Sequence, residues 1–274
     1  MKEGIGMPSS KEGSDNSGPR QGVPELFEVK AAAVSLGVRS LARFTPWLES
    51  ELLGVRSLTG PGGTCVDVGA AAGLYTAELA RAVGPGGVVH SVEPLVFAHA
   101  VPSRLLGLRD HPNVVRHALA LGETEGKSVM SVPIRNGRMV TGRSFVVSGA
   151  FGLGQNREFD EHIEVVVAMR TLDGLCESAG IGQVDFMKID VEGRELQVLK
   201  GGAALIERCA PALLLEVEQR HLSRYGTHTG DLLSWLADHG YTMRAWRNGT
   251  WQKVPDLSPA HRNYLFTAKD PAGR

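Results

Sequence analysis

Short apolar runs alternate with segments of helical periodicity along most of the chain. Strands are predicted at 64–68, 88–92 and 114–118, with helices at 73–83 and 97–108 between them. The alternation resumes with a strand at 184–189, a helix at 193–207, a strand at 212–217, a helix at 229–239 and strands near 241–246 and 263–267. This order predicts an α/β fold with an open, mostly parallel sheet flanked by helices, whose ligand site lies at the carboxyl ends of the strands.

The remaining segments divide the chain further. Residues 1–22 carry almost no apolar side chains and are expected to form a flexible tail, because they cannot bury enough surface to order themselves. Residues 23–58 read as a helical extension, which either covers an active site, packs on the core or offers an apolar surface for a homodimer. The main domain is expected over 59–270. It includes short strands at 128–133 and 163–169 and a Gly- and Arg-rich loop, 135–157, on the substrate side.

The first predicted strand runs into a glycine-bearing turn and then a helix. Asp67 stands before Gly69, and Gly73 precedes the helix. A dinucleotide-binding turn has the pattern G-x-G-x-x-G, but Ala71 replaces the middle glycine, so a pyrophosphate is not expected. An acid at Asp67 suits a cationic cofactor with free hydroxyls such as S-adenosylmethionine, although a turn or cap role explains Asp67 equally well.

The second predicted strand ends in another acid. Glu93 follows Gly73 by 20 residues, which is the usual interval for a carboxylate that binds both ribose hydroxyls of a nucleotide. Alone, Glu93 could be a solvated strand end. Together, Asp67 and Glu93 favour a nucleoside-binding site.

Charged residues gather around the strand predicted at 184–189. Lys188 and Asp190 share one face, so they either pair in the core or straddle a substrate hydroxyl. Glu192 and Glu195 are expected in the first turn of the next helix, where acids favour the positive end of its dipole.

The next strand repeats this pattern of acids. Glu216 and Glu218 share a face and, with Asp190, could supply the oxygen ligands of Mg²⁺ or another divalent cation. His221 is a candidate general base, because its neutral ring can take a proton from a hydroxyl; a surface histidine is the plainer interpretation.

In this order, these motifs resemble the FkbM-type family of S-adenosylmethionine-dependent methyltransferases over roughly residues 64–241. The resemblance rests on Val66-Asp67-Val68-Gly69 with Gly73 and Tyr75, Val92-Glu93-Pro94, Ala120-Leu121-Gly122, Arg170-Thr171-Leu172-Asp173, Leu214-Leu215-Glu216 and, most specifically, Lys188-Ile189-Asp190-Val191-Glu192-Gly193 followed by Glu195.

The resemblance implies a Rossmann-like methyltransferase fold with a seven-stranded sheet. It also implies O-methylation of a small molecule, such as a sugar, nucleoside or other specialised metabolite of natural product biosynthesis. The expected cofactor contacts are Asp67, Gly69, Ala70, Gly73 and Tyr75 at the amino-acid end, Glu93 and Pro94 at the ribose, Ala118 and Leu119 at the adenine, and Asp190 near the reacting centre. The catalytic candidates are Asp190, His221 and Lys188.

Composition narrows the alternatives. The net charge is −1, so no nucleic-acid partner is expected. No apolar run reaches membrane-spanning length, so no membrane partner is expected, and we expect a cytoplasmic location. An NAD-dependent oxidoreductase would need the middle glycine of the dinucleotide-binding turn, where this chain has Ala71. Two alternatives stay open: a non-catalytic member that binds cofactor or a partner protein, and an RNA methyltransferase. The latter would use the arginines of the insertion, namely Arg135, Arg138, Arg143 and Arg157.

Overall fold

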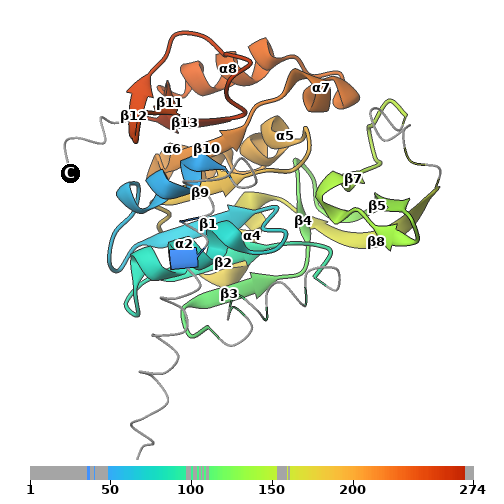
Figure 1. Ribbon diagram of the computed structural model, residues 1–274, viewed down its shortest axis with the longest axis horizontal. Coiled ribbons are helices and arrows are strands. Elements are labelled where there is room, and N and C mark those ends of the chain that lie inside the picture. The colour runs from blue at the N-terminus through green and yellow to red at the C-terminus, as the bar shows by residue number, and fades with distance from the viewer. Residues whose placement is uncertain are drawn as a thin grey trace, which may run out of the picture.

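The large sheet contains eight strands in the order β12-β11-β13-β10-β9-β1-β2-β3 (Figure 1). In chain order these strands are β1 (Thr64–Val68), β2 (Val88–Val92), β3 (Val114–His117), β9 (Phe186–Ile189), β10 (Ala212–Glu216), β11 (Thr242–Arg247), β12 (Thr250–Lys253) and β13 (Asn263–Thr267). Five neighbouring strands of this sheet are parallel, namely β10, β9, β1, β2 and β3. β13 lies between β10 and β11 and runs antiparallel to both. The Rossmann-like methyltransferase fold expected from the sequence is thus observed.

The computed structural model describes residues 49–96, 111–152 and 161–268, with single residues at 36, 37, 40, 100, 104, 106, 108 and 159. The tail at 1–22, most of the extension at 23–58 with its predicted dimer surface, most of the helix predicted at 97–108, and Arg157 lie outside this set. The described end of the extension is a 3-10 helix, η1 (Ser50–Ser57), which buries Leu52 and Val55.

An additional strand and a divided helix differ from the prediction for the large sheet and its helices. β12 is an eighth strand, joined to β11 by the two-residue turn Asn248-Gly249, whose φ angles are +52° and +79°. The helix predicted at 193–207 is divided into α5 (Glu195–Lys200) and α6 (Ala203–Cys209). The division falls at Gly201-Gly202, where the backbone packs closely: a Cβ on Gly201 would lie 2.1 Å from the Gly122 carbonyl oxygen.

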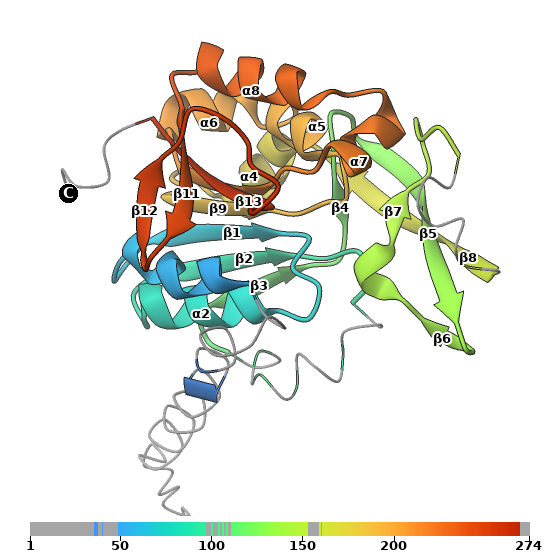
Figure 2. The same ribbon diagram turned by 45° about the horizontal axis from the view of Figure 1, so that its top comes forward.

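Helices cover both faces of the large sheet. α2 (Leu74–Val83) and η1 lie on one face, whereas α4 (Leu172–Ala179), α5, α6 and α8 (Thr229–Asp238) lie on the other (Figure 2). Side chains of β10 alternate between the two faces. Leu213 and Leu215 pack on the face covered by α4, α5, α6 and α8, whereas Leu214 packs on the face covered by α2 and η1. Within the described ranges, every helix is too short or too polar to pass through a bilayer.

A smaller sheet lies beyond the carboxyl ends of the parallel strands (Figure 2). It consists of β4 (Ala120–Leu121), β5 (Gly126–Arg135), β6 (Arg138–Met139), β7 (Phe145–Val146) and β8 (Glu161–Arg170), with the short helix η2 (Thr141–Arg143) between β6 and β7. Short parts of the segment predicted as a loop at 135–157 belong to this sheet, namely the end of β5, β6 and β7. Its own core includes Leu95, Met130 and Val132.

The strand register brings the predicted site to one place. Val68 at the end of β1 is paired with Val92 of β2 and Ile189 of β9. Gly69, Glu93 and Asp190, which follow these three residues, therefore emerge together at the edge of the large sheet that faces the smaller one.

Candidate functional site

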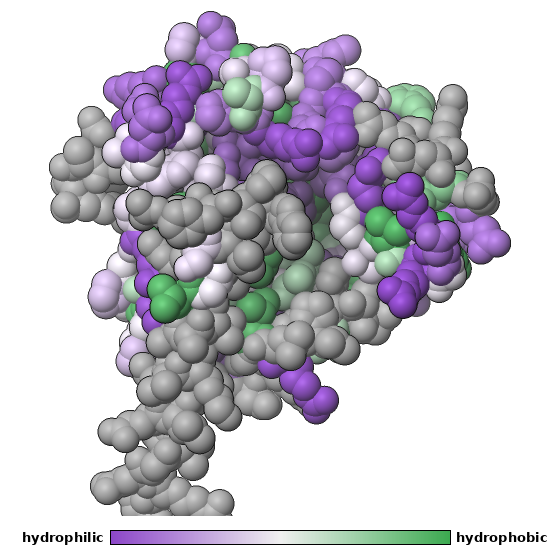
Figure 3. Space-filling view, in the orientation of Figure 1, coloured by the Kyte–Doolittle hydropathy of each residue, from purple (hydrophilic) through white to green (hydrophobic). Residues whose placement is uncertain are grey.

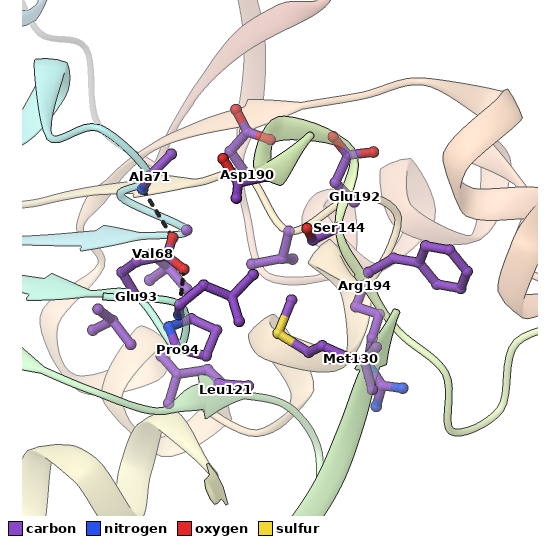
Figure 4. Close-up of a pocket in the computed structure, with 18 of the residues that line it drawn as sticks. Val68, Ala71, Glu93, Pro94, Leu121, Met130, Ser144, Asp190, Glu192 and Arg194 are labelled. Carbon is purple, nitrogen blue, oxygen red and sulfur yellow. Dashed lines mark hydrogen bonds between the residues drawn. The ribbon is translucent and has the colours of Figure 1, made fainter. Parts of the chain in front are cut away.

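A cavity of about 270 Å³ lies between the carboxyl edge of the large sheet and the smaller sheet. The surface is hollowed here, with hydrophilic side chains toward α7 (Gln219–Leu222) and hydrophobic ones below them (Figure 3). The close-up shows the same division: Asp190 and Glu192 lie on one side, and Pro94, Leu121 and Met130 on the other (Figure 4). Ligand pockets combine apolar walls with a few polar groups in this way.

Glu93 is fixed at the edge of the cavity by two backbone groups. Its Oε2 accepts a hydrogen bond from the Ala71 amide at 2.9 Å, and its Oε1 accepts one from the Leu95 amide at 2.7 Å (Figure 4). Each carboxylate oxygen keeps a second lone pair. Glu93 therefore remains able to accept hydrogen bonds from a ligand in the cavity.

The glycine-bearing turn lies under the cavity. Gly69 has φ +75° and lines the cavity, and a Cβ there would lie 1.8 Å from the Asp190 carbonyl oxygen. Gly73 has φ +87° at the start of α2 and borders a separate small pocket. Ala70 is buried and lines neither of these cavities.

Asp67 points away from the cavity. Its side chain is 2% exposed and accepts a hydrogen bond from the Thr76 hydroxyl at 2.5 Å. Burial raises the pKa of Asp67 to about 6. The Asp67 carboxylate therefore does not face the cavity, where the predicted contact with a cofactor would form. Its partner is Thr76, inside the protein.

The partly buried Tyr75 and the buried Lys188 lie together behind the site. The Tyr75 hydroxyl donates to Glu49 Oε2 at 2.5 Å, and Lys188 Nζ lies 5.3 Å from the centre of the Tyr75 ring. Lys188 also donates to Asn263 Oδ1 at 2.7 Å and lies 3.4 Å from Asp190 Oδ2. Burial opposes the Lys188 charge, but nearby carboxylates, led by Asp190, outweigh burial and raise the lysine pKa.

Of these residues, Glu49 and Asp190 line the cavity, whereas Tyr75 and Lys188 do not. Lys188 is 1% exposed. In this structure Lys188 therefore contacts Asn263 and Asp190 rather than the cavity, and its predicted catalytic role stays a prediction.

The apolar side of the cavity comes from both sheets. Val92, Leu119, Leu121 and Met130 line it. Leu119 was predicted to contact an adenine, and Ala118, predicted beside it, is not among the lining residues.

His221 lies behind the cavity wall, between two carboxylates. Its Nδ1 is 3.2 Å from Glu216 Oε2, and its Nε2 is 3.4 Å from Glu192 Oε2. His221 is buried and does not line the cavity, whereas Glu192 and Glu216 do. Direct proton removal from a substrate by His221, as predicted, therefore lacks access.

Glu192 and Glu195 were expected in the first turn of a helix. Glu192 instead lies in the turn before α5, with φ +57°, and faces the cavity. Glu195 does begin α5, but it is 2% exposed, and its Oε1 accepts hydrogen bonds from the Val191 and Gly193 amides, both at 3.2 Å. The missed signal was in the sequence: Gly193, directly after Glu192, indicates a tight turn rather than a helix.

The predicted metal ligands are not brought together as a set. Ligand atoms of Glu216, Glu218 and His221 lie within 4.8 Å of one another, but Asp190 is not part of this group. The group also has protein partners, because Glu218 binds Arg220 and Arg262, and both His221 nitrogens face carboxylates. This donor set does not fit a resident divalent cation, and we assign none of these residues as metal ligands.

The smaller sheet supplies the remaining wall. Thr141, Ser144 and Phe145 line the cavity, in the segment predicted to lie on the substrate side. The Ser144 hydroxyl is buried and has no hydrogen-bond partner among the residues that the structure describes. A polar ligand in the cavity could provide one.

The described arginines of the insertion do not line the cavity. Arg135 and Arg143 are placed over the Phe159 ring, with their guanidinium carbons 6.0 and 5.7 Å from its centre. Neither they nor Arg138 lines the cavity. Arg194 does line the cavity, and its Nη1 donates to the Ser148 carbonyl at 2.7 Å.

Comparison with known proteins identifies a family. Residues 67–243, well over half of the chain, match the methyltransferase FkbM domain. No curated protein matches the chain.

Several solved structures are similar at low identity. The methyltransferase FkbM from Methylobacillus flagellatus KT is 19% identical, with a TM-score of 0.43. The match covers 89% of this chain and 58% of that protein, so this chain spans little more than half the length of that protein. The O-methyltransferase from Bacillus cereus in complex with SAH is 12% identical, with a TM-score of 0.43, over 92% of this chain and 93% of that one. Cofactor-bound Rv0187 from MTB is 14% identical, with a TM-score of 0.44, over 87% and 89%. These similarities carry no assignment by themselves, and the family rests on the domain match.

Proposed function

The chain belongs to the FkbM methyltransferase family, and on that premise we propose that it transfers a methyl group from S-adenosylmethionine to a hydroxyl of a small molecule. The acceptor would be a sugar, nucleoside or other specialised metabolite of a biosynthetic pathway. A cytoplasmic location and a homodimer remain predictions from the sequence.

The observation that carries the proposal is the position of Glu93. Its carboxylate is fixed at the cavity edge by the Ala71 and Leu95 amides and keeps free lone pairs. A carboxylate at the end of the second parallel strand binds the ribose hydroxyls in nucleotide-binding folds of this kind. Glu93 therefore fits the ribose of S-adenosylmethionine.

The rest of the cavity fits the other parts of the cofactor. Val92, Leu119 and Leu121 offer an apolar surface for an adenine. Gly69 allows the turn to approach the ligand closely, and Asp190 and Glu49 offer negative charge near a sulfonium and an ammonium. The cofactor supplies an electrophilic methyl group, so the protein mainly has to align the acceptor oxygen and remove its proton.

The polar side favours a small hydroxylated acceptor. Ser144 has an unpartnered hydroxyl there, and Asp190, Glu192 and Glu216 can accept hydrogen bonds from hydroxyl groups. An RNA acceptor is less well supported, because Arg135, Arg138 and Arg143 do not line the cavity and the net charge is −1.

The test is transfer of labelled methyl from S-adenosylmethionine by the full chain. It is offered a panel of monosaccharides, nucleosides and phenolic and aliphatic alcohols, and separately transfer and ribosomal RNA. We expect labelled product in the small-molecule panel that is stable to alkali, as a methyl ether is. Label in RNA alone would favour the RNA methyltransferase. Binding of S-adenosylhomocysteine without any transfer would favour a non-catalytic member.

A further inference from the structure

We propose that Glu192 is the catalytic base of the methyl transfer, and that His221 and Glu216 position it and hold its charge. The inference rests on the proposed function and adds the group that takes the proton. It replaces His221 and Asp190, which the sequence suggested for this task.

Access distinguishes Glu192 from His221. Glu192 lines the cavity with 17% of its side chain exposed, whereas His221 lies behind it with 5% exposed. A base must come within hydrogen-bond reach of the proton that it removes. Glu192 can meet an acceptor in the cavity, whereas His221 lies behind Glu192 and Glu216 and does not face that acceptor.

Side-chain contacts distinguish Glu192 from Asp190. Asp190 Oδ2 is 3.4 Å from Lys188 Nζ, so this carboxylate is already engaged by a buried lysine. Glu192 faces an imidazole, which is itself shared with Glu216. Its Oε2 makes no hydrogen bond within the described residues besides this ionic contact at 3.4 Å.

The backbone holds Glu192 in an unfavourable conformation. Its φ of +57° is uncommon for a residue with a Cβ. The Arg224 guanidinium donates to the Glu192 carbonyl at 3.0 Å, and Glu195 binds the amides on both sides of Glu192. Strained positions held by several bonds are typical of functional sites.

The proton affinity of Glu192 suits the task. Burial raises its pKa to about 7, against the opposing effect of His221. Burial lowers the pKa of His221, but Glu216 and Glu192 outweigh burial and raise it, which favours a positive charge on the ring beside Glu192. The charged and titratable groups that face Glu192 are His221 on α7, Arg224 on η4 (Ser223–Tyr225), Glu216 at the end of β10 and Asp190 in its own turn.

The step balances in atoms and charge. The acceptor O–H bond breaks as its proton passes to Glu192, the acceptor oxygen forms its bond to the methyl carbon, and the carbon–sulfur bond breaks with its electron pair left on sulfur. Glu192 then releases the proton to water when product leaves.

The experiment compares Glu192→Gln with wild type on an acceptor from the panel. We expect kcat to fall roughly 100- to 10,000-fold, which is the usual contribution of a general base, while S-adenosylhomocysteine affinity stays within about twofold. Glu192→Asp should recover part of the rate, because it restores the carboxylate. Glu207→Gln, on the exposed side of α6, is the matched control and should leave both values unchanged.

The positioning residues are tested by pH. In wild type, kcat should rise as the pH passes about 7, because the base must be deprotonated. In His221→Gln the midpoint should move upward by about one unit, since the neighbouring positive charge is lost. In Glu216→Gln, NMR of labelled histidine should show that His221 loses its proton at a lower pH than in wild type.

Each outcome decides the proposal. Full activity of Glu192→Gln, or a midpoint that does not move in His221→Gln, would overturn it while the methyltransferase stands. Failure of every panel acceptor with S-adenosylhomocysteine still bound would overturn the proposed function, and the role of Glu192 with it.

Discussion

Gly193 lies directly against the backbone of His221. A Cβ on Gly193 would be 2.3 Å from the His221 carbonyl oxygen, and the glycine itself has φ +107°. The turn from Asp190 to Gly193 is therefore packed between the Gly69 turn on one side and α7 on the other. This close packing is what brings Glu192 onto the His221 ring.

Gly193→Ala should therefore lose both stability and activity. The alanine would clash with a backbone oxygen and occupy a backbone conformation that suits glycine, which together cost at least about 2 kcal/mol. For a chain of this size, the melting temperature should fall by roughly 4–8 °C. Thermal unfolding measures the loss.

Gly182→Ala provides the control for that variant. No atom lies within 4 Å of a Cβ at Gly182, and its φ is not in the left-handed region. Its melting temperature should match wild type. Equal melting temperatures for all three proteins would show that the turn is not packed as described.

Asp67→Asn should change how stability depends on pH. The folded pKa of about 6 exceeds the ordinary value of 3.8, so between these pH values the folded protein holds a proton that the unfolded chain has released. Wild-type stability should therefore fall as the pH rises from about 4 to about 6, by on the order of 2–3 kcal/mol from this group. Asparagine does not titrate and should remove that part of the fall. Denaturant unfolding at pH 4, 5, 6 and 7.5 measures it, and parallel curves for the two proteins would contradict the burial of this carboxylate.

Asp67→Asn also tests the cofactor contact predicted for Asp67. Because Asp67 points to Thr76 and not into the cavity, S-adenosylhomocysteine should bind the variant within about twofold of wild type. A loss of tenfold or more by calorimetry would restore the predicted contact.

Chelation should leave methyl transfer intact. In the group formed by Glu216, Glu218 and His221, Glu218 is paired with Arg220 and Arg262, and His221 with Glu192 and Glu216, so protein partners already occupy these ligand atoms. Enzyme dialysed against EDTA should keep its rate, and added Mg²⁺ should not raise it. A rate that collapses after dialysis and returns with Mg²⁺ would instead place a metal in the mechanism.

The sequence predicted the parallel half of the fold well, because its signals are local. Apolar runs such as 64–68 and 88–92 match β1 and β2 at both ends, since buried strands need uninterrupted apolar side chains. The prediction of one continuous helix over 193–207 was wrong at Gly201, which packs against Gly122, a residue distant in sequence. β12 was missed although Asn248-Gly249 is a strong local hairpin signal.

For the candidate site too, the sequence predicted the positions of residues better than the contacts of their side chains. Strand ends placed Gly69, Glu93 and Asp190 at one edge correctly, because the register of parallel strands follows from the fold. The direction of a side chain does not follow from its position along a strand end. Asp67 turned inward to Thr76, and His221 turned behind Glu192, through contacts that no spacing in the sequence encodes.

The most direct test of the account is calorimetric titration of the full chain with S-adenosylhomocysteine. We predict one site per chain with a dissociation constant in the micromolar range, about −8 kcal/mol. Glu93→Ala should bind at least tenfold more weakly because the ribose loses its carboxylate, whereas the same change at the exposed Glu164 should have no effect. No binding to wild type, or equal binding to Glu93→Ala, would contradict the assignment of this cavity to S-adenosylmethionine.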